Sequence, residues 1–262
     1  LGSGDIGLIM ARRMHLEGAD VEAVLEILPF SGGLTRNIVQ CLDDFDIPLR
    51  MQQTVVDIKG KDRVESVTVA EVDDNLEPIP GTEYEIECDT VLFSVGLIPE
   101  NELSKEAGLE MHDVTGGPIV NEGRETDIEG IFACGNVLHV HDLVDWVTEE
   151  SIQAGKTAAD YLQGGIERRE NEIDVNPGEN VSYIVPHNIT NKVEDRNLVD
   201  LYLRCTQPME HVTINLYSGD EKLLDKSENR VEPGEMITLP VPDQMITDEM
   251  DNLKVDIVKE GE

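Results

Sequence analysis

The chain has 262 residues, 39% of them apolar, which is enough to bury a hydrophobic core. Its 55 acidic residues outnumber 20 basic ones, and the formal charge of -35 disfavours nucleic acid and anionic membrane surfaces as partners. The four cysteines are far apart and form no C-x-x-C pair, and the sequence has no signal peptide and no apolar stretch near the roughly 20 residues of a membrane span, so we expect a soluble, cytoplasmic protein.

A glycine-rich motif opens the chain. Residues 2–7 read Gly-Ser-Gly-Asp-Ile-Gly, the G-x-G-x-x-G pattern that joins the first strand of a βαβ unit to its helix. Only Leu1 precedes it, so we expect the preceding strand to be missing and the chain to be a fragment. The following helix, predicted over residues 5–17, offers unpaired N–H groups to a pyrophosphate. The predicted phosphate-binding residues are Gly2, Ser3, Gly4, Asp5, Ile6 and Gly7.

An acidic residue ends the next predicted strand. Residues 21–25 read as a strand, and Glu26 follows 22 positions after Gly4, where a dinucleotide-binding unit places its ribose contact. A carboxylate there accepts ribose hydroxyls and repels a 2′-phosphate, so the sequence favours NAD over NADP. The alternative is that Glu26 is a solvated acid at the end of a strand.

Alternating and helical patterns continue up to residue 96. Helical spacing of apolar residues and then period-two alternation predict a helix, a strand and a β-meander. A nearly continuous apolar run follows, typical of a strand buried on both faces. These elements are helix 34–45, strand 51–58, two meander strands with Val67, Val69, Tyr84, Ile86 and Cys88 on one face, and strand 90–96.

Three segments together resemble one family. They are residues 2–7, 91–100 and 117–136, and their order and spacing are similar to those of FAD-dependent pyridine nucleotide-disulfide oxidoreductases, flavoproteins with two dinucleotide-binding domains. The resemblance covers about residues 1–165. It implies FAD as a second cofactor beside NAD.

The resemblance also implies positions for the flavin. Strand 90–96 would return the chain to the flavin domain, with Gly96 against a cofactor. Residues 131–136 would form the last flavin-domain strand, where Gly135-Asn136 stands in place of the family's Gly-Asp at the ribityl chain of FAD. A helix is predicted over residues 146–162, with Ile152, Ala159 and Leu162 on its packed face and Gly155 for close packing. The backbone of Val147 and Thr148 would face the flavin's pyrimidine edge. The alternative for this helix is an ordinary core helix.

Two histidines follow the Gly-Asn pair. His139 and His141 lack the spacing of a closed zinc site, so we predict no metal and interpret them as surface-loop residues, with a substrate-side role as the alternative. No C-x-x-C exists for disulfide chemistry, and Cys134 reads as a packing residue of a strand. The catalytic residues are unknown.

The chain changes character after residue 165. A polar linker is predicted over residues 166–178, followed by short alternating runs separated by turn signals. They predict a small all-β sandwich over residues 179–262. Its expected role is subunit docking or covering the flavin domain. The predicted strands are 181–185, 199–205, 212–217, 236–241 and 253–258.

The sequence therefore predicts an α/β chain. A Rossmann-like NAD-binding domain with a β-meander crossover spans residues 1–96, the C-terminal part of an FAD-binding domain spans 97–165, and the β-sandwich follows. The predicted function is hydride transfer between NAD(H) and FAD, with electrons passed to a small-molecule or protein acceptor or to a partner redox subunit. A homo-oligomer is the other predicted assembly. The alternative is a non-catalytic nucleotide-binding or assembly subunit with the β domain as docking module.

Overall fold

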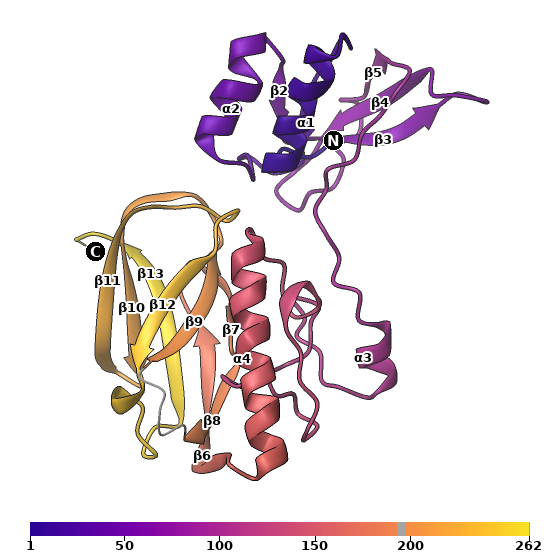
Figure 1. Ribbon diagram of the computed structural model, residues 1–262. Coiled ribbons are helices and arrows are strands. Elements are labelled where there is room, and N and C mark those ends of the chain that lie inside the picture. Colours follow the sequence, from indigo (N-terminus) through magenta and orange to yellow (C-terminus); the bar gives the residue numbers. More distant parts are fainter. Residues whose placement is uncertain (193–197, 262) are drawn as a thin grey trace. The chain divides into compact units, whose positions relative to one another are not determined.

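The computed structural model describes residues 1–192 and 198–261. The chain divides into two compact units, Leu1–Gly96 and Leu97–Glu262 (Figure 1). The division falls where the first predicted domain ends. The predicted flavin segment and β domain lie together in the second unit, and each unit is described separately below.

The first unit begins with the predicted helix. Helix α1 (Asp5–Leu16) buries Leu8 and Ala11 and ends just before Gly18, whose φ of +94° suits glycine. A short parallel pair follows, β1 (Val24–Glu26) with β2 (Leu49–Met51). Between these strands, α2 (Thr35–Cys41) and η1 (Asp43–Phe45) replace the single helix predicted over 34–45. Leu8, Val24 and Leu42 share one core cluster, so the α/β prediction for this segment is confirmed.

The predicted meander is also confirmed. Strands β3 (Gln53–Lys59), β4 (Ser66–Glu71) and β5 (Tyr84–Glu87) pair antiparallel in chain order. Gln52, with a φ of +52°, separates β2 from β3 where one strand is predicted. Val67 and Val69 pack with Leu25 in a second core cluster.

The predicted buried strand over residues 90–96 is wrong. The segment is assigned no strand, and Leu92 and Phe93 are exposed. Its strand-like hydrogen bonds are made with Leu1, whose N–H group donates to the Leu92 carbonyl and whose carbonyl accepts from the Ser94 N–H, both at 2.7 Å. A strand forms when several successive residues pair with a neighbouring strand. Here, among the described residues, the two bonds come from Leu1 alone.

The second unit opens with little regular structure. Helix α3 (Glu102–Glu106) and η2 (Gly135–Val137) precede the long helix α4 (Val144–Gln163). The strand predicted over 131–136 does not form, because Phe132 makes a single bridge to Glu125 in place of a ladder.

Helix α4 buries a face that the sequence does not predict. Its buried residues are Glu150, Ala154 and Thr157, whereas Ile152 and Leu162 are exposed. Gly155, interpreted as a close-packing position, has no described atom within 4 Å of where a Cβ would lie. The packed face of α4 therefore carries a carboxylate.

Two facing sheets complete the second unit. A five-stranded sheet, in the order β11-β10-β13-β6-β8, and a three-stranded sheet, β12-β9-β7, share one apolar core, so the predicted sandwich is confirmed. Figure 1 shows α4 beside this sandwich, and Trp146 of the helix contacts Tyr202 of β9. The strands are β6 (Glu167–Pro177), β7 (Val181–Val185), β8 (Asn188–Lys192), β9 (Leu198–Cys205), β10 (Met209–Ser218), β11 (Glu221–Val231), β12 (Ile237–Pro242) and β13 (Asn252–Lys259), with η3 (Asp243–Met245) after β12.

The predicted linker is corrected by β6. Residues 167–177 form an 11-residue strand that pairs with both β8 and β13, so the segment predicted as linker is part of the larger sheet.

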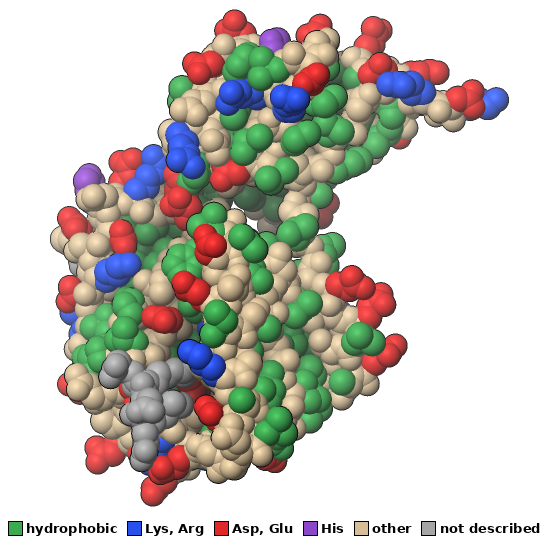
Figure 2. Space-filling model, viewed as in Figure 1, with side chains coloured by type: hydrophobic (Ala, Val, Ile, Leu, Met, Phe, Trp, Pro, Cys, Tyr) green, Lys and Arg blue, Asp and Glu red, His purple; other side chains and the backbone are tan. Residues whose placement is uncertain are grey.

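On the surface, acidic side chains are scattered over the visible face in Figure 2. Within the described ranges, no helix combines the length and apolar character that crossing a membrane requires.

Candidate cofactor-binding sites

The three motif glycines have three different surroundings. Gly2 has a φ of +98°, and a Cβ there would lie 2.0 Å from the carbonyl oxygen of Ser94. A Cβ at Gly7 would lie 2.5 Å from the Gly2 carbonyl oxygen. Gly4 has an ordinary φ of -63°, and no described atom lies within 4 Å of its Cβ position. Gly2 and Gly7 thus permit tight packing, whereas Gly4 leaves open space in which a ligand can approach the backbone.

The start of α1 fits an anion. Gly4 caps the helix, and no side chain caps it within the described part of the chain, so the first amides keep free hydrogen-bonding capacity. Asp5 does not compete for them, since its Oδ1 accepts hydrogen bonds from the Leu34 N–H at 2.9 Å and from Asn37 Nδ2 at 2.6 Å. Ile6 is exposed. The predicted phosphate-binding residues therefore lie together in one turn.

Glu26 is bound to that turn. Its carboxylate is only 6% exposed, so its interpretation as a solvated strand-end acid is wrong. Oε2 accepts hydrogen bonds from the Ser3 amide at 2.9 Å and the Ser3 hydroxyl at 2.5 Å, and Oε1 accepts from the Leu28 amide at 2.9 Å. A carboxylate offers about four acceptor positions, so Glu26 keeps roughly one for a ribose hydroxyl.

A second glycine pair lies over the motif. The Ser31 hydroxyl donates to the Ser3 carbonyl at 2.9 Å, and the Gly32 amide donates to the Ser3 hydroxyl at 3.3 Å. A Cβ at Gly33 would lie 2.8 Å from the Ser3 carbonyl oxygen, so the chain approaches closely there. This contact was not predicted, although the run Ser31-Gly32-Gly33 shortly after the strand is a turn signal in the sequence.

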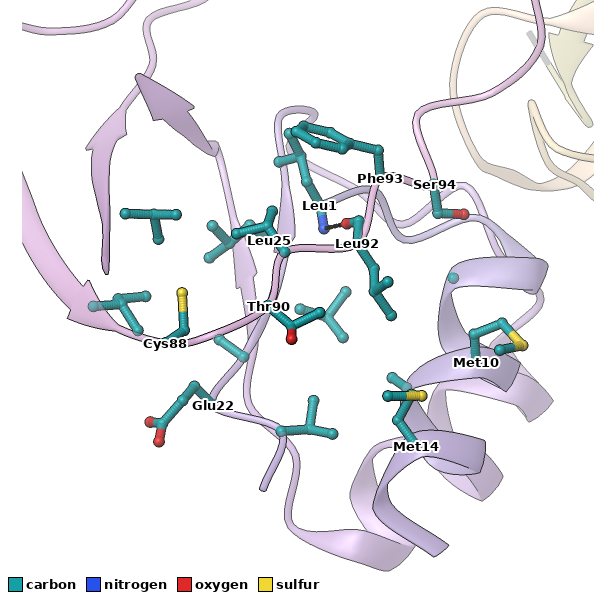
Figure 3. Close-up of a pocket in the computed structure, with 18 of the residues that line it drawn as sticks. Leu1, Met10, Met14, Glu22, Leu25, Cys88, Thr90, Leu92, Phe93 and Ser94 are labelled. Atoms are coloured by element: carbon teal, nitrogen blue, oxygen red, sulfur yellow. Dashed lines mark hydrogen bonds between the residues drawn. The ribbon is translucent and has the colours of Figure 1, made fainter. Parts of the chain in front are cut away.

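A separate apolar pocket borders the motif. Its volume is about 420 Å³, and its walls come mainly from α1, residues 19–25 and residues 86–94. Figure 3 shows Met10 and Met14 of α1 on one side and Leu92 on the other. Gly2, Ile6 and Gly7 of the motif line the pocket, but Gly4 and Glu26 do not, so the helix cap and the predicted ribose contact lie outside it.

In the second unit, the Gly135-Asn136 pair forms a tight turn. Gly135 has a φ of +73°, and its amide donates to Glu150 Oε2 at 2.7 Å. Asn136 is exposed, and its Oδ1 accepts a hydrogen bond from the His141 amide at 3.1 Å. The turn is thus held from inside while Asn136 faces solvent. Gly96, at the end of the first unit, has a φ of +89° and open space at its Cβ position within the described structure.

Helix α4 begins earlier than the sequence predicts. Since it starts at Val144 with Leu143 as N-cap, its four free amides belong to residues 143–146. The amides of Val147 and Thr148, predicted to face the flavin, lie one step further in, where helix geometry pairs them with carbonyls of the preceding turn. The helix start remains the anion-favouring end, although Asp145 adds a negative charge there.

A buried polar cluster lies beneath the Gly135 turn. His139 and His141 are 1% and 9% exposed, so their interpretation as surface-loop residues is wrong. Both direct Nε2 at Glu150, at 3.2 Å from Oε1 and 2.9 Å from Oε2. Arg124 Nε donates to Oε1 at 2.9 Å. With the Gly135 amide, the carboxylate interacts with four partners.

These contacts decide the charges of the cluster. Burial opposes ionisation of Glu150, but hydrogen bonds from the two histidines and the charge of Arg124 outweigh it and hold its pKa below the ordinary value. Burial also lowers the pKa of His139, an effect that Glu150 only partly offsets. The cluster therefore consists of one ion pair, Arg124 with Glu150, and a neutral His139. The ligand-type atoms of His139, His141 and Glu150 lie within 4.8 Å of one another.

Comparisons with known proteins agree with this description. The family model described as "Pyridine nucleotide-disulphide oxidoreductase" matches residues 1–161. The NAD(P)H sulfur oxidoreductase (CoA-dependent) of Pyrococcus abyssi is 30% identical over 149 residues, which are 55% of this chain and 30% of that protein. The NADH oxidase of Methanocaldococcus jannaschii is 28% identical over 178 residues, 63% of this chain and 36% of that protein.

Solved structures give the same picture. The thioredoxin reductase of T. acidophilum superposes with a TM-score of 0.52 at 25% identity, covering 62% of this chain and 51% of that one. The chain thus spans about a third of the two curated relatives and about half of this structure. The family match over residues 1–161 includes both the Gly2–Gly7 motif and the Gly135-Asn136 turn.

Proposed function

Because the chain belongs to the pyridine nucleotide-disulphide oxidoreductase family, we propose that it acts in hydride transfer between NAD(H) and FAD. Members of this family are FAD-dependent and use NAD(P)H. When bound, FAD supplies the ring that exchanges hydride with the nicotinamide. The protein contributes the two turns that hold and orient the cofactors.

The observation that carries the proposal is that the three motif glycines have different surroundings. Gly2 and Gly7 are needed by the packing of the turn, whereas Gly4 has no packing role among the described residues and faces open space at the start of a helix. This is what a pyrophosphate requires. Glu26, fixed by Ser3 and Leu28, lies beside the same turn and supports NAD over NADP, because its charge opposes a 2′-phosphate.

For FAD, the support comes from the second unit. Gly135 and the exposed Asn136 form a turn whose backbone is fixed from below, and Asn136 retains its Nδ2 donor and a second Oδ1 lone pair for a hydroxyl group. The free amides at residues 143–146 add a site of positive partial charge. These groups fit the ribityl chain and an electron-rich ring edge.

The electron acceptor is a small molecule or another protein in this proposal. The four described cysteines are free, and none forms a C-x-x-C pair. The named relatives include reductases of sulfur compounds, but no described cysteine of this chain supports that chemistry. A reducing, cytoplasmic location agrees with four free thiols.

A spectroscopic experiment tests the proposal. The purified protein is refolded or incubated with FAD, freed of unbound flavin and titrated with NADH under anaerobic conditions. A yellow protein that NADH bleaches faster than NADPH does is the expected result. A colourless protein, or a yellow one that NADH leaves unchanged, contradicts hydride transfer. Binding of NADH without flavin reduction would identify the alternative, a non-catalytic nucleotide-binding subunit.

A further inference from the structure

One buried carboxylate holds three points of a single loop. The Gly135 amide, His139 Nε2 and His141 Nε2 all lie within 3.2 Å of the oxygens of Glu150. Residues 135–141 are the segment that joins the predicted flavin turn to helix α4. Because Glu150 is itself part of α4, the loop is attached to the helix that follows it.

We propose that Glu150 is a positioning residue for flavin binding, which fixes the Gly135-Asn136 turn from its buried side. This rests on the proposed function, in which that turn holds FAD. Glu150 touches no exposed surface, since its side chain is fully buried, so it acts through the turn and not on the cofactor.

The chemistry of the cluster requires a carboxylate at this position. A carboxylate has about four acceptor positions, and here four groups aim at them: Arg124 Nε, the Gly135 amide and two imidazole nitrogens. An amide in its place offers one acceptor oxygen and directs an NH2 group at donors. Loss of the charge also leaves the Arg124 guanidinium buried without its counter-ion.

The same contacts argue against a metal ion. A cation held by His139, His141 and Glu150 would lie close to the Arg124 guanidinium, which is 2.9 Å from Oε1. The Gly135 amide already occupies Oε2 at 2.7 Å. Hydrogen bonds with the two imidazoles satisfy both oxygens without placing a metal cation in a buried site.

Aromatic residues of the β-sandwich close the cluster off from water. The Arg124 guanidinium lies over the Tyr202 ring at 5.6 Å, and the Tyr183 ring meets His139 edge-on at 5.9 Å. These tyrosines belong to β9 and β7. Low local polarity strengthens each hydrogen bond to Glu150, so the C-terminal strands contribute to the rigidity of the turn.

The test compares Glu150→Gln with Glu149→Gln. Both variants remove one charge from adjacent positions of α4, but Glu149 is exposed and its substitution leaves the cluster intact. For Glu150→Gln we expect the Gly135 amide to exchange its hydrogen about tenfold faster or more, and FAD affinity to fall by a similar factor. Neither quantity should change in Glu149→Gln. Normal amide exchange and normal FAD affinity in Glu150→Gln would overturn the proposal.

A double variant separates positioning from folding. Glu150→Gln with Arg124→Gln removes the unpaired buried charge, so this protein should fold even if the single variant does not. We expect it to recover thermal stability while the Gly135 amide stays unprotected and FAD binding stays weak. Recovery of all three would mean that the ion pair only stabilises the fold, and the proposal would be wrong.

The amide measurement does not depend on the flavin. If the unmodified protein fails to bind FAD, the proposed function fails, whereas slow exchange at Gly135 that Glu150→Gln abolishes would still establish that Glu150 holds the turn. Metal analysis of the unmodified protein completes the experiment. One equivalent of zinc that Glu150→Gln releases would replace the hydrogen-bonded arrangement with a metal site and overturn the inference.

Discussion

The carboxylate of Glu26 accepts hydrogen bonds from both the amide and the hydroxyl of Ser3, at 2.9 and 2.5 Å. The two residues are 23 positions apart in the chain, and Ser3 lies inside the glycine motif. The predicted ribose contact and the predicted phosphate turn are therefore one hydrogen-bonded assembly. A change at Glu26 should affect the turn as well as the ribose.

Glu26→Gln should weaken NADH binding about tenfold, because an amide replaces the charged acceptor. NADPH binding should weaken less, since the charge that repels a 2′-phosphate is also lost, and the preference between the two nucleotides should narrow. Titration of intrinsic fluorescence with each nucleotide measures both constants. The control is Glu22→Gln, which removes an exposed charge from the segment that leads into β1. Unchanged NADH affinity in Glu26→Gln would rule out the ribose assignment.

Alanine at Gly4 and at Gly2 should have opposite consequences. Gly4→Ala suits the local φ of -63° and clashes with no described atom, so the fold should keep or slightly gain stability, by up to about 1 kcal/mol. The new methyl group would project into the space proposed for the pyrophosphate, so NADH affinity should fall at least about tenfold.

The comparison variant is Gly2→Ala. Its φ of +98° and the Ser94 carbonyl oxygen only 2.0 Å from the new Cβ should lower the melting temperature markedly. Thermal unfolding and nucleotide titration of both variants give the answer. Tight NADH binding by a well-folded Gly4→Ala protein would show that the open space at Gly4 is not the phosphate site.

Local patterns predicted the elements whose burial follows their own periodicity. Strand β13 covers the predicted residues 253–258, because apolar residues alternate along it and these alternate positions are buried. Strands β6 and β11 gave no such signal. Both are 11 residues long and rich in charged side chains, and they form because neighbouring strands pair with them.

In the candidate site, too, local patterns do not reveal residues that are positioned by distant partners. Glu26 was predictable because a fixed spacing relates it to the glycine motif. Glu150 was not, because its partners Arg124 and His139 lie 26 and 11 residues away, and nothing local marks a glutamate as buried. The run of residues 90–96 was misjudged for a related reason. Its apolar composition indicates a buried strand, but a strand also needs pairing partners along its length.

Acid should destabilise the second unit through His187. Burial, followed by the charge of His112, lowers the pKa of His187 from 6.5 to about 3. The unfolded chain therefore binds a proton that the folded chain does not between about pH 6.5 and about pH 3, and stability falls as the pH falls through this window. The lowered pKa of Glu150 acts in the same direction below about pH 4.5.

His187→Gln should reduce this pH dependence. The glutamine oxygen can replace Nδ1 as acceptor for the Val120 amide, now at 3.1 Å, but it does not titrate. The slope of unfolding free energy against pH should become about 1 kcal/mol per pH unit smaller between about pH 6 and about pH 5, as measured by urea unfolding. His211→Gln, at an exposed position of the same unit, is the control. Equal slopes in His187→Gln and the unmodified protein would contradict the assigned neutral state.

Arg204 links the C-terminal strands to the loop above the cluster. From β9 it forms an ion pair with Asp142, donates to the Val140 carbonyl at 3.1 Å and to the Tyr183 hydroxyl at 3.0 Å, and is largely buried. Burial opposes its charge, but Tyr183 and Asp142 outweigh that effect and raise its pKa, so it stays ionised. The residues predicted to form a docking module thus hold the loop that follows the proposed flavin turn.

Arg204→Met keeps most of the side-chain length and removes these bonds. Unfolding free energy should fall by about 2 kcal/mol, because the Tyr183 hydroxyl and the Val140 carbonyl lose their donor. FAD affinity should fall as well, since residues 140–142 lose their attachment to the sandwich. Arg13→Met breaks an exposed ion pair with Glu17 and should cost at most about 1 kcal/mol. Chemical unfolding and flavin titration of both variants decide the matter. Full stability and flavin binding in Arg204→Met would mean that the β-sandwich does not support the flavin turn, and that its predicted role as a docking module is the better one.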